Sequence, residues 1–127
     1  VELYGSAIMV NSTFAAERPN AIKGFLRAFM KALKETVKQP SSAVGSVLKR
    51  NDLARKNVEL ERLTMAINEN IVTPEVKANG YGGIDDARFA RAVEQIALTY
   101  KFKGAKPKPR DVFDPSFLPS PAERKYK

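Results

Sequence analysis

The sequence contains neither cysteine nor histidine. It therefore cannot form a disulfide framework, a thiolate or imidazole metal site, or a catalytic triad that depends on either residue. Long apolar runs are also missing: the longest, residues 7–10, falls far short of the roughly 20 residues that cross a bilayer. We therefore expect no membrane-spanning helix, no catalytic residues, no cofactor and no metal site within this chain.

What is present fits one ordinary soluble domain or part of one: 127 residues, of which 43% are hydrophobic and 28% are charged. The net charge of +8 is unevenly distributed, because residues 101–127 alone hold eight basic and three acidic side chains. The sequence begins at Val1 without a basic start followed by an apolar stretch. We expect any signal peptide to have been removed or to lie outside this sequence.

Residues 1–10 predict a single β-strand, in which residues 7–10 are apolar without alternation. Such a strand is typical of a sheet that is covered on both faces. No second strand is predicted, and an isolated strand leaves backbone donors and acceptors unsatisfied. We expect its partners to be encoded upstream of Val1. Pairing with a copy in another chain is the less favoured alternative.

Helical patterns fill the chain from Asn11 to Lys101. A single turn over 14–17 is followed by helices over 19–38, 40–51, 57–71 and 85–100 and by a short turn over 74–80. Asn57 and Asp85 are expected N-caps, and Gly80 is an expected C-terminal signal. The apolar stripes expected to be buried are Ile22, Phe25, Leu26, Phe29, Leu33 and Val37; Leu60, Leu63, Ile67 and Ile71; and Phe89, Val93, Ile96, Ala97 and Tyr100.

The long helix over 19–38 also carries a basic stripe. Such a stripe can contact phosphate groups or anionic lipid. A solvated helix face is the favoured interpretation, because charged runs on amphipathic helices are usually that, and no aromatic residue interrupts this one. The stripe consists of Lys23, Arg27, Lys31, Lys34 and Lys38.

Two glycine-containing segments are candidate sites. Residues 80–83 precede a helix, as phosphate-binding loops do. Asp85 and Asp86 would repel a phosphate there, which favours a purely structural loop. Tyr4, Gly5 and Ser6 begin the predicted strand and are placed to present polar groups at a sheet edge or hinge. Packing of Tyr4 in a core, with Gly5 at a bulge, is an interpretation of at least equal weight.

Several runs, taken in order, resemble one protein family. They are residues 4–11, 18–29, 39–43, 82–88 and 111–119, and together they span nearly the whole chain. Their order and spacing are similar to those in the C-terminal part of periplasmic solute-binding proteins of ABC importers. The nearest branch is the group for nitrate, sulfonates, taurine and thiamine-pyrimidine precursors.

The resemblance implies a fragment of a type II two-lobed α/β fold that closes on its solute by a hinge. The chain would be mainly α with one N-terminal β-strand. Residues 1–106 would form the strand-plus-helices part of one lobe, and residues 107–127 a Pro-rich segment that runs extended across its surface. The resemblance also implies an extracytoplasmic location, an ABC permease as partner and no catalysis. Tyr4, Gly5 and Ser6 are the positions carried over as ligand neighbours.

Three alternatives remain open. The same fold includes enzymes of pyrimidine synthesis, from which a fragment without the active-site region would not be distinguished. A basic helical module could bind nucleic acid through the stripe, although no nucleic-acid partner is our primary expectation. A helical interaction module complete in itself would be a monomer with a cooperative melt. An uncovered strand edge and apolar face would favour self-association of a fragment.

Overall fold

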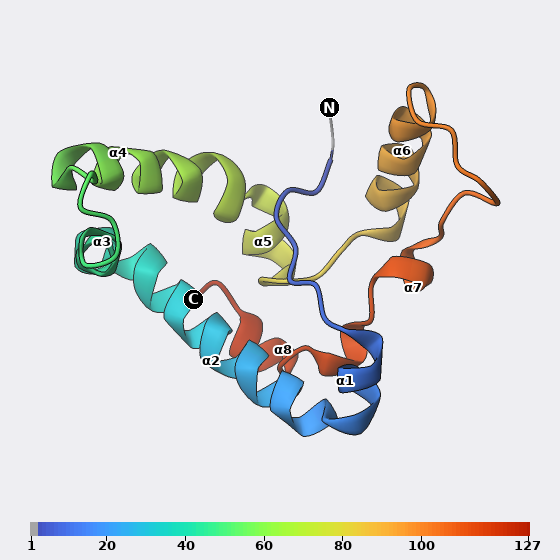
Figure 1. Ribbon diagram of the computed structural model, residues 1–127, viewed down its shortest axis with the longest axis horizontal. Coiled ribbons are helices and arrows are strands. Elements are labelled where there is room, and N and C mark those ends of the chain that lie inside the picture. The colour runs from blue at the N-terminus through green and yellow to red at the C-terminus, as the bar shows by residue number, and fades with distance from the viewer. Residues whose placement is uncertain (1–2) are drawn as a thin grey trace.

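The computed structural model describes residues 3–127 and is mainly helical (Figure 1). A π-helical turn, η1 (Ile67–Ile71), continues α4, and a 3-10 turn, η2 (Pro115–Phe117), lies between α7 and α8. The α-helices are α1 (Ser12–Glu17), α2 (Pro19–Lys38), α3 (Pro40–Leu48), α4 (Lys56–Ala66), α5 (Pro74–Asn79), α6 (Asp86–Ala97), α7 (Pro109–Val112) and α8 (Pro121–Arg124).

The strand predicted at the N-terminus is not formed within the described residues. Residues 3–10 belong to no helix or strand, and residues 1–2 lie outside the part of the chain that the structure describes. The physical reason is the lack of a partner, since none of the described residues offers a second strand for pairing. Ile8, Met9 and Val10 are consequently exposed rather than covered, by 44%, 93% and 45%.

Helix α2 has the predicted bounds, with Pro19 in its first turn and Gln39 as its C-cap. Its apolar stripe is only partly buried. Ile22 is buried, whereas Phe25 and Phe29 are 56% and 44% exposed and stack on each other with ring centroids 6.2 Å apart. The prediction that both rings are buried is therefore wrong for this chain, because no described element covers that side of α2.

Three of four capping residues have the predicted role, and one does not. Asn11 accepts a hydrogen bond from the Phe14 amide, and Gly80 ends α5 at a φ of 84°. The Asp85 carboxylate accepts a 2.7 Å bond from the Arg88 amide, which confirms it as the cap of α6. Asn57 was the wrong choice, since α4 already begins at Lys56 and has no side-chain cap.

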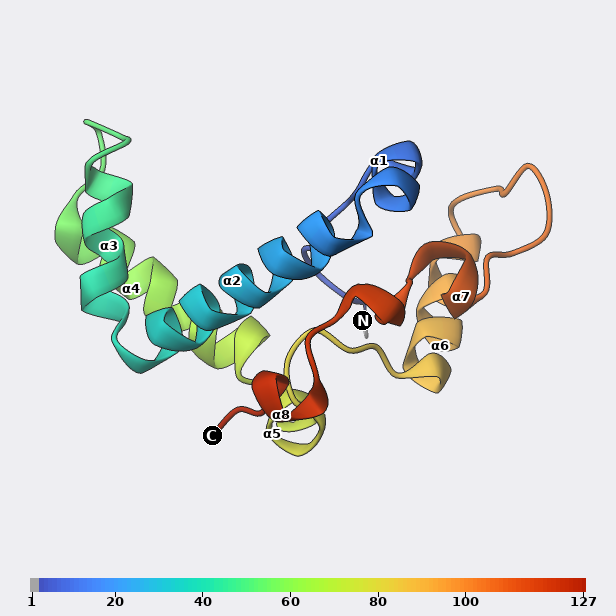
Figure 2. The same cartoon turned by 90° about the horizontal axis from the view of Figure 1, so that it is seen from below.

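The helices pack into an open, curved arrangement rather than around one dense core. Helix α3 lies against α4, and α2 contacts α1, α3, η2 and α8, so that α2 is the central support of the chain (Figures 1 and 2). The buried apolar side chains among the described residues come from α2, α3, η1, the turn after α5, and α6. They are Ile22, Met30, Val44, Ile67, Tyr81, Ala92 and Val93.

The C-terminal segment was expected to run extended, but it forms α7, η2 and α8. Each of these short elements begins with a proline, which suits a first helical position because proline lacks an amide hydrogen there. Helix α8 also has a capping box, in which Ser120 and Glu123 bond each other's backbone amides. Through η2 and α8 the segment returns to pack on α2.

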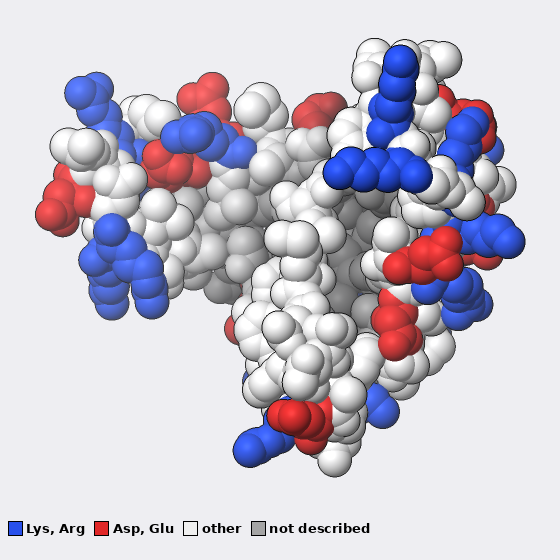
Figure 3. Space-filling view, turned by 45° about the vertical axis from the view of Figure 1, so that its right-hand side comes forward, with Lys and Arg blue, Asp and Glu red and all other residues white. Residues whose placement is uncertain are grey.

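Uncharged surface remains open over much of the molecule. On the face in Figure 3, a band of uncharged residues runs between groups of charged side chains that lie toward the edges. Large apolar side chains are exposed in turns and on a helix: Leu53 and Leu98, both in turns, are 90% and 85% exposed, and Met65 of α4 is 62% exposed. None of the described helices is long and apolar enough to cross a membrane.

Candidate functional site

The predicted ligand neighbours Tyr4, Gly5 and Ser6 lie in the N-terminal segment and have different surroundings. The Tyr4 hydroxyl donates a 3.2 Å hydrogen bond to Glu75 and accepts a 2.7 Å bond from the Asp85 amide. Gly5 and Ser6 are exposed, and a Cβ built on Gly5 meets nothing within 4 Å. None of the three residues lines either of the two hollows described below.

Tyr4 belongs to a polar cluster that fastens the N-terminal segment to α5 and α6. The Arg88 guanidinium lies 4.3 Å from the centroid of the Tyr4 ring and forms a 2.5 Å ion pair with Glu75. It also donates to the Leu3 carbonyl at 3.1 Å. Burial is the main cause that raises the pKa of the Tyr4 hydroxyl, with the neighbouring Glu75 carboxylate acting in the same direction. The cluster anchors this segment and leaves Gly5 and Ser6 accessible beside it.

A larger hollow lies elsewhere, between α2, the turn after α5 and the C-terminal residues. We call it the cationic groove, and its volume is about 730 Å³. Four residues of the basic stripe line it, and so does Lys127. Two aromatic residues, Tyr81 and Tyr126, form part of its wall, with ring centroids 6.4 Å apart. The stripe residues in the groove are Arg27, Lys31, Lys34 and Lys38.

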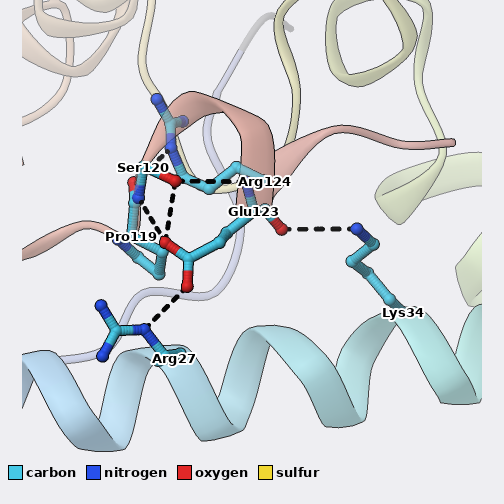
Figure 4. Close-up of polar contacts among 6 residues, drawn as sticks. All are labelled: Arg27, Lys34, Pro119, Ser120, Glu123 and Arg124. Carbon is cyan, nitrogen blue, oxygen red and sulfur yellow. Dashed lines mark hydrogen bonds and ion pairs between the residues drawn. The ribbon is translucent and has the colours of Figure 1, made fainter.

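Glu123 of α8 contacts two of the cations at one end of the groove (Figure 4). Its carboxylate accepts a 2.7 Å bond from Arg27, and its backbone carbonyl accepts a 3.4 Å bond from the Lys34 ammonium. Hydrogen bonds from Ser120 are the main cause that lowers the pKa of the Glu123 carboxyl, and Arg27 adds to the effect. Glu123 therefore stays charged and positions two of the cations, while Glu35 is the other carboxylate in the wall.

Lys31 and Lys38 differ from Arg27 and Lys34 because no described residue pairs with them. Neither makes an ion pair or a hydrogen bond within residues 3–127, and both are exposed. A flexible, unpaired ammonium group beside an aromatic wall retains its full capacity to bind an anion. Among its four stripe residues, the groove thus combines two fixed cations with two that have no partner in the described chain, and Lys127 is a fifth cation, 5.8 Å from the centroid of the Tyr126 ring.

Tyr81 contributes a buried polar atom to the same wall. Its side chain is 2% exposed, and its hydroxyl has no hydrogen-bond partner among the residues described. Burial raises the pKa of this hydroxyl, with a smaller contribution from the nearby Tyr126. Hydroxyls this deeply buried are normally paired, so an unpaired one calls for an explanation.

Arg124 fixes the position of Tyr81. The Tyr81 amide donates to the Arg124 carbonyl at 2.8 Å, and the Arg124 guanidinium donates back to the Tyr81 carbonyl at 2.9 Å. The guanidinium also donates to the Pro119 carbonyl at 3.1 Å (Figure 4). This clamp joins residues 43 positions apart and holds α8 against the turn.

A smaller hollow of about 230 Å³ lies between the loop before α6 and the C-terminal segment, lined in part by Gly83, Asp86 and Arg110. Its charged lining residues are Asp86, Arg110 and Arg124. The described residues contain no cluster of three or more carboxylates that could hold a metal ion.

One serine and one lysine, Ser46 and Lys49, have the Ser-x-x-Lys spacing of some hydrolases. Both are exposed, and no hydrogen bond joins their side chains. This pair therefore lacks the nucleophile-to-base contact that such chemistry needs.

The sequence indicated the cations of the groove but not the groove itself. The basic stripe was expected to be a solvated face without aromatic residues, whereas the fold brings Tyr81 and Tyr126 to it from distant positions. The capping-box pattern Ser120-x-x-Glu123 was the one local signal that α8 exists. Nothing in that pattern says which helix α8 packs against.

Comparisons with known proteins add no assignment: no family model, no curated protein and no solved structure matches this chain.

Proposed function

We propose that this chain forms the C-terminal helical part of an extracytoplasmic solute-binding protein, which delivers a small organic or anionic nutrient to an ABC permease. The observation that carries the proposal is the amount of surface left open. A compact monomer of 14.1 kDa would expose about 6,700 Å², whereas this chain exposes 9898 Å². The excess of roughly 3,000 Å² on this one chain is at least as large as the roughly 1,000 to 2,500 Å² that each partner buries in a large permanent interface.

The N-terminal segment supports the same proposal. No backbone amide of residues 3–10 donates a hydrogen bond within the described part of the chain, and Ile8, Met9 and Val10 are exposed. The backbone amides of such a segment are free to pair with a strand that the rest of a longer protein supplies. The resemblance found in the sequence supplies the specific family: a two-lobed binding protein whose strand returns to the first lobe.

In this proposal Tyr4, Gly5 and Ser6 lie beside the cleft between the two lobes. The polar cluster of Tyr4 with Glu75 and Arg88 holds the segment at a defined place on α5 and α6. The exposed Gly5 backbone and Ser6 hydroxyl are then available to a solute from the other side. Capture is pure binding by a few convergent polar groups, with a sulfonate, nitrate or pyrimidine precursor as solute and no catalytic step.

The test uses the complete gene product. Calorimetric titrations with taurine, sodium nitrate and an aminopyrimidine are expected to show saturable binding of one of the three. A Ser6→Ala variant is expected to weaken that binding several-fold. Ser41→Ala is the matched control, because Ser41 is also exposed but lies on α3. Equal affinities of the two variants would overturn the placement of the cleft.

Hydrogen exchange tests the proposed sheet separately. Amides of residues 7–10 are expected to be strongly protected in the complete product. Fast exchange at these positions, together with no binding of any of the three solutes, would overturn the proposed function. Protection that depends on protein concentration would instead identify pairing between copies. Turnover of a bound pyrimidine precursor would identify a synthesis enzyme of the same fold.

A further inference from the structure

The cationic groove is independent of the proposed solute cleft, because it shares no residue with Tyr4, Gly5 and Ser6. Its walls come entirely from this chain: α2 on one side, and Tyr81 with the C-terminal residues on the other. A volume of about 730 Å³ lies within the range of roughly 300 to 1,000 Å³ that small-molecule sites occupy.

The charge of the groove defines the head group that it accepts. Five cationic side chains face two carboxylates, and Glu123 is already engaged by Arg27 and Lys34. Of the three remaining cations, Lys127 lies 5.8 Å from the centroid of the Tyr126 ring, whereas Lys31 and Lys38 have no partner within residues 3–127. These two lie one turn and three turns from Arg27 on the same side of α2. Two ammonium groups on one wall suit an oxyanion that bridges them.

The aromatic wall defines the rest of the ligand. Tyr81 and Tyr126 meet at an angle of 60° and give the groove an aromatic side opposite α2, which carries the exposed ammonium groups. A flat ring or short alkyl chain can pack there, while an inorganic anion would leave that wall bare.

We propose that the cationic groove between α2 and α8 is a binding site for a small organic anion, with a carboxylate, sulfonate or phosphate head group held by Lys31 and Lys38 and an apolar body packed on Tyr81 and Tyr126. The two tyrosines belong to the turn after α5 and to the C-terminal residues, so Arg124 assembles the site by clamping these segments together. The proposal does not depend on the identity of the transported solute.

The test titrates the isotope-labelled complete gene product with benzenesulfonate and follows amide shifts by NMR. Shifts are expected to concentrate in residues 27–38, at Tyr81 and in residues 119–127. Sodium sulfate tests the head group alone and benzyl alcohol the body alone. Each is expected to bind at least tenfold more weakly than benzenesulfonate. Equal binding of sulfate would reduce the site to unselective charge attraction and overturn the proposal.

Matched double variants locate the head group. Lys31→Gln with Lys38→Gln is expected to weaken benzenesulfonate binding at least tenfold. Lys49→Gln with Lys56→Gln changes the net charge equally on exposed residues outside the groove and is expected to leave affinity within twofold. Equal losses in both pairs would overturn the site. All four changes are at exposed positions, so circular dichroism is expected to show an unchanged fold.

Two further measurements separate other occupants. A short single-stranded DNA that displaces benzenesulfonate, with an affinity that falls steeply with salt, would assign the groove to a polyanion and overturn the proposal. Occlusion of the groove by a second copy at high protein concentration would overturn it as well.

Discussion

The unpaired hydroxyl of Tyr81 allows a prediction of unusual sign, because removing a polar atom should stabilise the fold. The side chain is 2% exposed, and its hydroxyl has no partner in the described chain. A buried donor without an acceptor costs about 1 to 3 kcal/mol. Tyr81→Phe keeps the buried ring and abolishes that cost. We expect the free energy of unfolding to rise by about 1 to 2 kcal/mol.

The assay is urea denaturation of the complete gene product. The expected result is a higher midpoint with an unchanged slope, since a stability change without a change in exposed area moves only the midpoint. Tyr126→Phe is the control: Tyr126 is only half-buried, and its substitution should change the stability by less than about 0.5 kcal/mol. A loss of more than about 1 kcal/mol in Tyr81→Phe would show that the hydroxyl has a partner, and would refute the reasoning.

The pH dependence gives a second readout of the same atom. Burial raises the pKa of Tyr81 above its ordinary value of 10.0. The unfolded chain therefore loses this proton first as the pH rises, and deprotonation favours the unfolded state. The stabilising contribution is complete below pH 10.0 and is lost as the pH rises through the folded-state pKa. The advantage of Tyr81→Phe over the natural chain is expected to widen as the pH rises from 10.0 toward the folded-state pKa and to stay constant above it.

Three further predictions use urea denaturation or NMR titration of the complete product. Gly80→Ala should lower the free energy of unfolding by about 1 to 3 kcal/mol, because φ is 84° and the new Cβ would lie 2.8 Å from the Arg124 carbonyl oxygen. Gly5→Ala is the control and should be nearly neutral, because a Cβ at Gly5 lies in open space. Equal losses of stability in the two variants would contradict this prediction. Asp85→Ala should cost about 1 kcal/mol by uncapping α6, and an unchanged midpoint would contradict the cap. The pKa of Glu123 lies below its ordinary value of 4.5. The stabilising contribution of this carboxylate is therefore complete above pH 4.5 and is lost as the pH falls through the folded-state pKa. An NMR titration in which the Glu123 carboxyl titrates at or above 4.5 would refute the Ser120 and Arg27 contacts.

Local chemistry determined how much of the fold was predictable. The bounds of α2 follow from Pro19 and Gln39, and the start of α6 follows from the Asp85 carboxylate. Each depends on bonds that span a few residues, which a sequence pattern encodes directly. The prediction that Asn57 caps a helix is wrong for a related reason. Asparagine is a favourable N-cap, but α4 begins at Lys56 and has no side-chain cap.

Long-range docking explains what was missed. Phe25 and Phe29 follow the helical period of a buried stripe, but burial needs a covering element, and none of the described ones lies there. The prolines after Lys101 favoured an extended segment, whereas Pro109, Pro115 and Pro121 each begin a helical turn. The groove was unpredictable because the clamp between Tyr81 and Arg124 leaves no trace in local pattern.

Helix α2 relates the two proposals to each other. At 100° per residue, Ile22, Leu26 and Leu33 point toward the chain's own interior, and they are buried or half-buried. Arg27, Lys31, Lys34 and Lys38 lie on one flank and line the groove, while Phe25 and Phe29 lie on roughly the opposite flank, uncovered. A sheet or lobe that covers the phenylalanine flank would bury apolar surface without closing the groove. Solute capture by the longer protein and anion binding in the cationic groove are therefore compatible, and a variant that abolishes one should leave the other measurable.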